Sequence, residues 1–266
     1  MPLVNDSMMT VPSQLTVPAR NGRGLSASTL KIIGCIFMVI DHIGAILFPD
    51  LLILRIIGRL SYPFFAYFIA EGCRYTRNKC KRFLLVLGLA VLCEGVHFIM
   101  MGELEGGIFV NFCLSILLVY QVQAIKKTLA HKEFLKASLF LLLFAASVAG
   151  VYAFVEYVLY VDYGFWGVLI PVWTVLPDYK EGEAPDCCKA LSNRPVKLLF
   201  FAVGLLCLCI FRGLFESVQG YSLLALPILA LYNGRPGRKG LKYGFYLFYP
   251  AHLAVLWGIA FLLERL

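Results

Sequence analysis

Apolar segments of about the length that crosses a lipid bilayer recur along almost the whole chain. A helix rises 1.5 Å per residue, so about 20 apolar residues are needed to cross about 30 Å of hydrocarbon. The segments do not alternate between polar and apolar residues as the strands of a membrane β-barrel do. They lie at 29–49, 56–74, 83–101, 108–125, 134–155, 164–177, 196–215, 220–232 and 242–263.

These segments predict an all-α integral membrane protein, a polytopic bundle of about nine transmembrane helices. Composition agrees, because 60% of the 266 residues are hydrophobic and only 15% are charged, against about 45–50% and 25% in soluble domains. Segments 164–177 and 220–232 are short, and Pro227 interrupts the second. We expect one or two of the helices to be short or broken.

Basic residues mark alternate connections between the apolar segments. The net charge is +8, and the intervening connections are acidic. Cytoplasmic loops accumulate Lys and Arg, so we expect a multi-pass protein of the plasma (cytoplasmic) membrane with its N-terminus in the cytoplasm. The same rule explains the positive net charge, so we do not expect nucleic acid to be a partner. The basic connections are 20–31, 74–82, 126–136, 180–197 and 235–242.

Residues 1–28 are polar and rich in Ser, Thr, Pro and Gly, which predicts a disordered cytoplasmic tail before a single transmembrane domain, 29–266. No apolar core of a cleavable signal peptide begins within this tail. The nine cysteines show no pair of CxxC motifs, so we expect neither a zinc site nor a disulfide scaffold.

Several ionisable residues fall in or beside apolar segments, at the depth predicted to lie near the outer face. A charge at the centre of a membrane helix costs at least about 2.5–3.5 kcal/mol, so such residues usually line a functional cavity. These residues are Asp41, His42, Arg55, Arg59, Glu94, His97 and Asp162.

His42 is the natural general base of this outer group, because imidazole titrates near neutral pH. The alternative is a structural histidine held between helices. Glu94 or Asp162 could orient its ring. Asp41 could be catalytic or could pair with an arginine, and Arg59 could stabilise an oxyanion or only hold the first two helices together through Asp41.

A second group of charges lies at the predicted inner face. Lys31 precedes His42 by eleven residues, which is roughly 16 Å along a helix. Glu71 and Arg74 share a helix face and are expected to pair, with Arg77 nearby. The glycine-rich basic loop 232–240, with Asn233 and Arg235, suggests a phosphate cradle.

His252 lies near the middle of the last apolar segment, two residues after Pro250. That proline leaves the carbonyl of Tyr246 without a helical donor, which gives a polar kink in the membrane. A histidine beside such a kink is a functional candidate.

Six short strings, taken in order along the chain, resemble the TraX family of membrane proteins. The best-known member acetylates the N-terminal amine of a conjugative pilin, and the family is grouped with the wider transmembrane acyltransferases, which include the acyltransferase-3 enzymes. The strings are Ile40-Asp41-His42-Ile43-Gly44, Gly58-Arg59-Leu60-Ser61-Tyr62-Pro63-Phe64, Ala70-Glu71-Gly72 with Arg74-Tyr75-Thr76-Arg77-Asn78, Asp162-Tyr163-Gly164, Leu231-Tyr232-Asn233-Gly234 and Phe248-Tyr249-Pro250-Ala251-His252.

The resemblance implies an acyltransferase that moves an acetyl group from cytoplasmic acetyl-CoA to an amine or hydroxyl at the outer side, without a metal. His42 would be the general base or a transient acyl carrier. In the wider group an arginine is often separated from the histidine by ten residues. This chain has Lys31 at that position, so the cation is kept without the guanidinium. The residues expected at the catalytic centre are His42, Asp41, Arg59, Glu94 and Asp162, and those expected around the acetyl-CoA are Lys31, Glu71, Arg74, Arg77, Asn233, Arg235 and His252.

The sequence does not decide between three acceptors: an amine on a surface protein, a glycan hydroxyl and a lipid head group. We expect membrane lipids to surround the protein. The same buried charges would also suit a transporter or flippase for an anionic solute or lipid intermediate. A third reading is a non-enzymatic assembly factor in which the charges only lock helices together.

Overall fold

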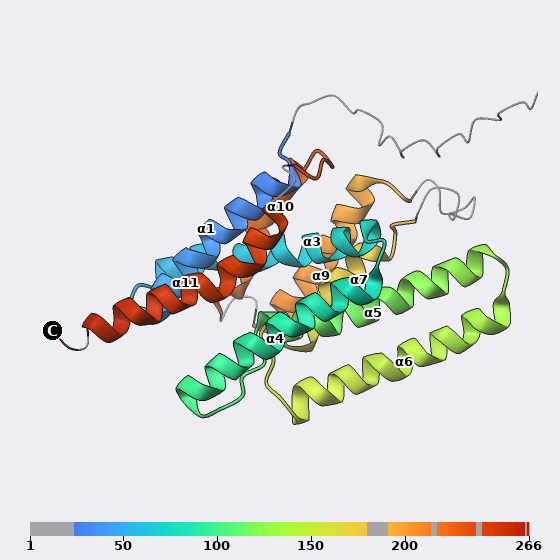
Figure 1. Cartoon of the computed structure of the whole chain (residues 1–266). Coiled ribbons are helices and arrows are strands. Elements are labelled where there is room, and N and C mark those ends of the chain that lie inside the picture. The colour runs from blue at the N-terminus through green and yellow to red at the C-terminus, as the bar shows by residue number, and fades with distance from the viewer. Residues whose placement is uncertain (1–23, 180–190, 214–216, 238–240, 264, 266) are drawn as a thin grey trace, which may run out of the picture.

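The computed structural model describes residues 24–179, 191–213, 217–237, 241–263 and 265. Over these residues the chain forms a bundle of helices without a β-strand (Figure 1). Most of the tail predicted for 1–28 lies outside the described residues. The described part of it begins at Gly24 and enters the first helix at Ala27.

All nine predicted segments contain a helix in the described part of the chain. By length and composition seven of these segments could cross a membrane, α2 and α3 counting as one, and the two that are shorter are those expected to be short. The chain is therefore a multi-pass membrane protein. The elements are α1 (Ala27–Ile46), α2 (Leu52–Gly58), α3 (Ser61–Tyr75), α4 (Lys79–Met101), α5 (Ile108–Ala130), α6 (Phe134–Tyr157), α7 (Gly164–Val175), α9 (Arg194–Phe211), η1 (Val218–Leu224), α10 (Ala225–Ala230) and α11 (Leu241–Leu263).

The second predicted segment, 56–74, lies in one candidate span that is made of two helices, α2 and α3. It begins at Leu52 and breaks between Gly58 and Ser61. Pro63 has no backbone N–H to give to the carbonyl of Arg59, four residues earlier, so an α-helix cannot run through this point unchanged. Gly58 also touches α1, since a Cβ added there would lie 2.3 Å from the Cβ of Asp41.

The short helix α7 has 12 residues, or about 18 Å, which is less than the hydrocarbon thickness. Pro171 lies inside it and leaves the carbonyl of Gly167 without a helical donor. The hydroxyl of Tyr62, on α3, donates a hydrogen bond to this carbonyl at 2.8 Å. Ser115, on α5, donates to the carbonyl of Val168 at 2.8 Å.

Backbone carbonyls at the C-terminal end of α7 also accept hydrogen bonds from a side chain of a neighbouring helix. The ammonium group of Lys126, a buried residue of α5, donates to the carbonyls of Val175 and Asp178. Unpaired carbonyls in a membrane are costly, so irregular backbone at this depth needs partners supplied by the protein. Side chains of α3 and α5 supply them here, and α7 becomes a fixed part of the core.

The core is built around α3, α5, α7 and α9. Tyr62, Phe64, Ile116, Ile170 and Phe201 are almost completely buried in it. By contrast α6 packs along α5 at the edge of the bundle, and α11 lies beside α1 (Figure 1).

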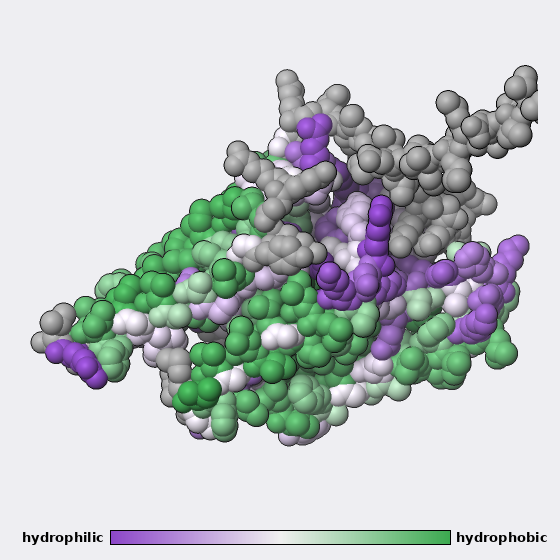
Figure 2. Space-filling model, viewed as in Figure 1, coloured by the Kyte–Doolittle hydropathy of each residue, from purple (hydrophilic) through white to green (hydrophobic). Residues whose placement is uncertain are grey.

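The edge helices turn apolar side chains outward. Leu135, Leu139 and Leu142 of α6 are strongly exposed. Figure 2 shows apolar residues over most of the visible face, with hydrophilic residues gathered at helix ends such as the α5–α6 turn. Such a surface suits contact with lipid.

We expect Gly204→Ala to destabilise the bundle, because a Cβ at Gly204 would lie 2.8 Å from the Cδ1 atom of Trp173 on α7 and 3.1 Å from its Cβ. Overpacking of this kind costs about 1–3 kcal/mol and should lower the Tm in detergent by about 2–10 °C.

Gly150→Ala, on α6, is the matched control, because nothing lies within 4 Å of the added Cβ. Its Tm should stay the same or rise slightly, since alanine favours a helix over glycine. Equal Tm values for the two variants would contradict the close packing of α7 against α9.

Candidate functional site

His42 lines a cavity of about 600 Å³ at the C-terminal end of α1. We call it the His42 cavity. Its wall combines residues of the six helices α1, α2, α3, α4, α5 and α11 with the connections before α5 and α7 and the region after α9. The residues used below are Asp41, His42, Arg55, Arg59, Glu94, Glu105, Asp162, Tyr163, Arg212, Gln219 and Tyr249.

A second cavity, of about 470 Å³, lies at the N-terminal end of α1 and contains Lys31. We call it the Lys31 cavity. Much of its wall is aromatic, and two of its cations come from different helices. Its lining includes Lys31, Phe68, Glu71, Arg82, Tyr232, Phe245 and Tyr246.

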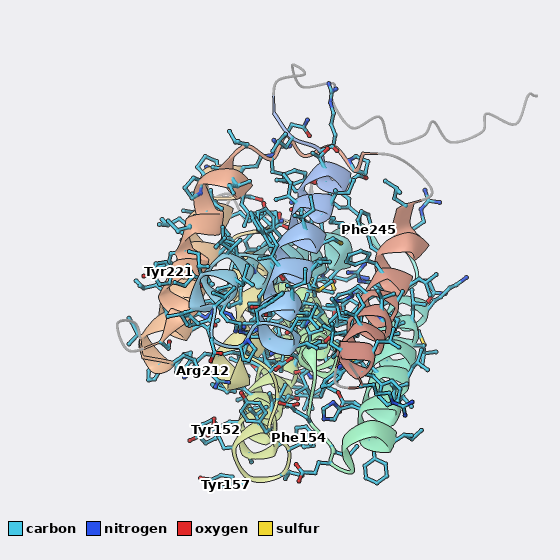
Figure 3. The ribbon with its side chains drawn as sticks, turned by 90° about the vertical axis from the view of Figure 1, so that its left-hand side faces the viewer. Tyr152, Phe154, Tyr157, Arg212, Tyr221 and Phe245 are labelled. Carbon is cyan, nitrogen blue, oxygen red and sulfur yellow. The ribbon has the colours of Figure 1, made fainter. Side chains whose placement is uncertain are left out.

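The two cavities share part of their walls. Met38, Phe65, Ile108, Phe109 and Tyr249 line both of them. Figure 3 places Phe245, from the Lys31 cavity, nearer the N-terminal end of α1 than Arg212, from the His42 cavity.

Lys31 and His42 lie on the unbroken helix α1, roughly 16 Å apart along its axis. The two cavities therefore adjoin along α1, with a cation in one and an imidazole in the other.

Asp41 is 8% exposed and takes two arginines as partners. Arg55 donates to its carboxylate at 2.9 Å and to its backbone carbonyl at 2.9 Å, and Arg59 reaches the carboxylate at 3.0 Å. The pairing left open by the sequence is thus present with both arginines. Arg59 lines the cavity, and its buried Nε has no hydrogen-bond partner among the described residues.

His42 has a partner that the sequence did not suggest. Its Nδ1 lies 2.7 Å from the Nε2 of His252, on α11. His252 is 9% exposed, and its Nδ1 lies 2.8 Å from the carbonyl of Phe248. The two rings come from segments 210 residues apart, a pairing that local periodicity cannot reveal.

Glu94 and Asp162 had been considered as residues that orient His42, and both line the same cavity. Instead, the carboxylate of Glu94 accepts from the backbone N–H of Gly107 at 2.7 Å. The backbone carbonyl of Asp162 accepts from Asn111 at 2.7 Å. In the described part of the chain the ring of His42 is oriented by His252.

Asp162 lies in the connection between α6 and α7. Burial and the neighbouring Glu105 raise the pKa of its carboxyl to about 6, against the opposing effect of Arg59. Tyr163 follows in a left-handed backbone conformation, with φ of 63°. Its ring stacks on that of Tyr62, with the ring centroids 3.8 Å apart. A non-glycine residue in this conformation is often found at functional sites.

The expected pairing of Glu71 with Arg74 was wrong. Glu71 contacts the ammonium of Lys197, on α9, while Arg74 contacts the carboxylate of Asp178. Lys197 also lies 3.0 Å from Asp178 and is 4% exposed. Lys197 stands at the start of the apolar segment 196–215, and this position could have identified it as a buried charge.

Of the remaining residues expected around acetyl-CoA, His252 lies beside His42 instead, and Arg77, Asn233 and Arg235 lie in connections between helices. Asn233 donates to the carbonyl of Gly24 at 3.1 Å, and the carbonyl of Arg235 accepts from the N–H of Ala27 at 2.9 Å. These two residues fasten the start of α1, and Arg77 is exposed on the surface.

Arg74, Arg77, Asn233 and Arg235 are not among the described residues that line the Lys31 cavity. Two lining residues that sequence reasoning missed are Arg82, in the Lys31 cavity, and Arg212, in the His42 cavity. Arg82 lies in the basic connection 74–82, which was interpreted mainly as a determinant of membrane topology. Arg212 lies near the end of the apolar segment 196–215.

Comparison with known proteins gives a family match and two relatives. A family model described as TraX protein matches residues 26–260. The chain is 27% identical over 256 residues to a protein of Dichelobacter nodosus named "Probable fimbrial assembly protein FimC, serogroup H1", covering 87% of this chain and 94% of that protein. It is 54% identical over 39 residues to an uncharacterized protein, RP591, of Rickettsia prowazekii, covering 15% of this chain and 16% of that protein. No solved structure matches the chain.

We expect Asp41→Asn to lower the free energy of unfolding by about 3–5 kcal/mol, because two guanidinium groups then remain in an apolar site without a carboxylate. Chemical unfolding in mixed micelles measures this change.

Glu133→Gln is the matched control, since Glu133 pairs with Lys136 at the surface, where the two side chains are 41% and 65% exposed. Removing a surface pair of this kind costs less than about 1 kcal/mol. Equal losses in the two variants would show that Asp41 does not hold the arginines.

Asp162→Asn should stabilise the protein in a pH-dependent way. The pKa of Asp162 is about 6 in the folded chain and about 3.9 when unfolded. Between these values the folded chain keeps a proton that the unfolded chain loses, so wild-type stability falls as pH rises from about 4 to about 6 and is constant above that.

The gain in Tm of Asp162→Asn over the wild type should therefore be small at pH 4 and largest above pH 6. Asp50→Asn, at an exposed position, is the matched control. A gain that is the same at pH 4 and pH 7.5 would contradict the raised pKa.

Proposed function

The chain belongs to the TraX family, and from that premise we propose that it is a membrane-embedded acetyltransferase. It takes the acetyl group from cytoplasmic acetyl-CoA and transfers it to an amine or hydroxyl at the opposite face of the plasma membrane. The observation that carries the proposal is the pair of adjoining cavities along α1, one with Lys31 and the other with His42.

The Lys31 cavity suits the head of acetyl-CoA. Lys31 and Arg82 supply cations for phosphate groups. Phe68, Tyr232 and Tyr246 supply aromatic faces for the adenine ring. The basic connections at this end of the bundle support a cytoplasmic position for this cavity.

The wall shared by the two cavities suits the rest of the donor. Met38, Phe65 and Phe109 offer apolar surface for the thin arm that carries the thioester. The arm of acetyl-CoA is on the order of 15–20 Å long, comparable with the rise of roughly 16 Å from Lys31 to His42. A donor held at Lys31 would then present its acetyl group beside His42.

At the His42 cavity the reaction is an acyl transfer. His42 removes a proton from the acceptor amine or hydroxyl, whose nitrogen or oxygen forms a bond to the acetyl carbonyl carbon. The guanidinium of Arg59, which lines the cavity, stabilises the oxygen on which negative charge develops. The carbon–sulfur bond then breaks, and His42 returns the proton to the departing thiolate.

The choice of acceptor is supported by the relative in Dichelobacter nodosus, whose name describes a probable fimbrial assembly protein. This favours a protein subunit of a surface appendage over a glycan or a lipid head group. The lining of the His42 cavity has a mixed charge, because it contains Glu94, Glu105 and Asp162 as well as Arg212. It therefore offers partners for either end of a polar acceptor group.

We expect His42→Ala to lower the rate of CoA release by about 10²-fold or more, because the general base is removed. The assay contains protein in lipid nanodiscs, acetyl-CoA and a membrane extract as the source of acceptor, and a thiol reagent measures released CoA.

His131→Ala is the matched control, since His131 is exposed at the end of α5, and it should keep the wild-type rate. Both variants should keep the wild-type Tm. An unchanged rate in His42→Ala, or no acceptor-dependent release by the wild type, would overturn the proposal.

A further inference from the structure

We propose that His252 is the positioning residue for His42: it fixes the tautomer of His42 so that Nε2 is the nitrogen left to act as a base. The inference deepens the acetyltransferase function proposed above and rests on it. It starts from a chain of two hydrogen bonds between α11 and α1.

The tautomers follow from the chemistry of the last acceptor. A backbone carbonyl can only accept, so the Nδ1 of His252, 2.8 Å from the carbonyl of Phe248, carries a hydrogen. The other nitrogen of a neutral His252, Nε2, is then an acceptor. It lies 2.7 Å from the Nδ1 of His42, which must therefore be the donor. The Nε2 of a neutral His42 keeps its lone pair.

The position of His252 is itself fixed. Its ring stacks on that of Phe248 with centroids 5.0 Å apart and an angle of 11°. Tyr249 packs edge-on against both histidines, at 5.5 Å from His252 and 6.1 Å from His42. His252 is 9% exposed, so water competes little for its hydrogen bonds.

The charged groups around His42 do not replace this partner. Arg55 and Arg59 direct their hydrogen bonds to Asp41. Glu94 accepts from a backbone N–H, and no hydrogen bond joins Asp162 to His42 among the described residues. His42 lines the cavity while His252 stands behind it, outside the lining residues.

The hydrogen bond also serves the proton-transfer step. When Nε2 of His42 takes the acceptor's proton, the Nδ1–H still points at a neutral acceptor on His252. A donor that becomes charged makes a stronger hydrogen bond, so the pair stabilises the imidazolium as it forms. His252 itself does not touch the reacting atoms, and its effect passes through the ring of His42.

Two amide variants separate this role from simple packing. In His252→Gln the side-chain oxygen can stand where Nε2 stood and accept from His42, whereas in His252→Asn the amide is too short and stands where Nδ1 stood. We expect kcat for CoA release to stay within about 10-fold of wild type in His252→Gln and to fall about 10²-fold or more in His252→Asn. The KM for acetyl-CoA should change little in either.

A direct reading of the tautomer does not depend on activity. The chain has only four histidines, so the ring nitrogens of protein labelled with ¹⁵N-histidine can be assigned in lipid nanodiscs by single substitutions. We expect His42 in the wild type to carry its hydrogen on Nδ1, to keep it there in His252→Gln and to populate the Nε2–H form in His252→Asn.

A wild-type His42 with its hydrogen on Nε2, or equal kcat values for the two amide variants, would overturn the inference. If the tautomers are as expected but the wild type releases no CoA, the inference about His42 and His252 stands and the acetyltransferase proposal fails. The two ideas are thus separable in one set of samples.

Discussion

The buried ion pairs of Asp41 with Arg55 and Arg59 determine how the first two segments of the bundle meet. A lone charge in an apolar segment is costly, and three together are tolerated because the carboxylate faces both guanidinium groups. The pairs hold α2 against the C-terminal half of α1, where Gly58 allows the backbone to approach Asp41. The wall of the His42 cavity is built on that contact.

A second constraint is that backbone polar groups within a membrane need partners. The short helix α7 meets it through Tyr62, Ser115 and Lys126, side chains of its neighbours. The result is a helix held firmly in the core of the bundle, although it is too short to cross the bilayer by itself. Both the ion pairs and these hydrogen bonds serve to keep a polar interior open inside an apolar shell.

The sequence predicted the parts of this fold that depend on apolar length. All nine segments, including the two short ones, were found in this way, because burial in lipid acts on each segment separately. The break in the second segment was not predicted, although Pro63 lies inside that segment and has no backbone N–H to give to the carbonyl of Arg59.

The candidate site was harder to predict where its partners are distant in sequence. Asp41 and its arginines belong to consecutive segments, so their pairing could be foreseen. Glu71 and Arg74 looked like a local pair at helical spacing, yet each finds a buried partner from another part of the chain. Spacing along a helix tells which face a residue occupies, and packing between helices decides which partner it meets. The pairing of His42 with His252 is the clearest case.

We propose that one passage connects the Lys31 cavity to the imidazole of His42 and holds acetyl-CoA along its length. The most direct measurement is a density map of the protein in lipid nanodiscs with coenzyme A added. We expect the phosphate density of coenzyme A beside Lys31 and Arg82, its arm between Met38 and Phe109, and its thiol next to His42. Coenzyme A bound elsewhere, or an arm that does not enter the wall shared by the two cavities, would contradict it.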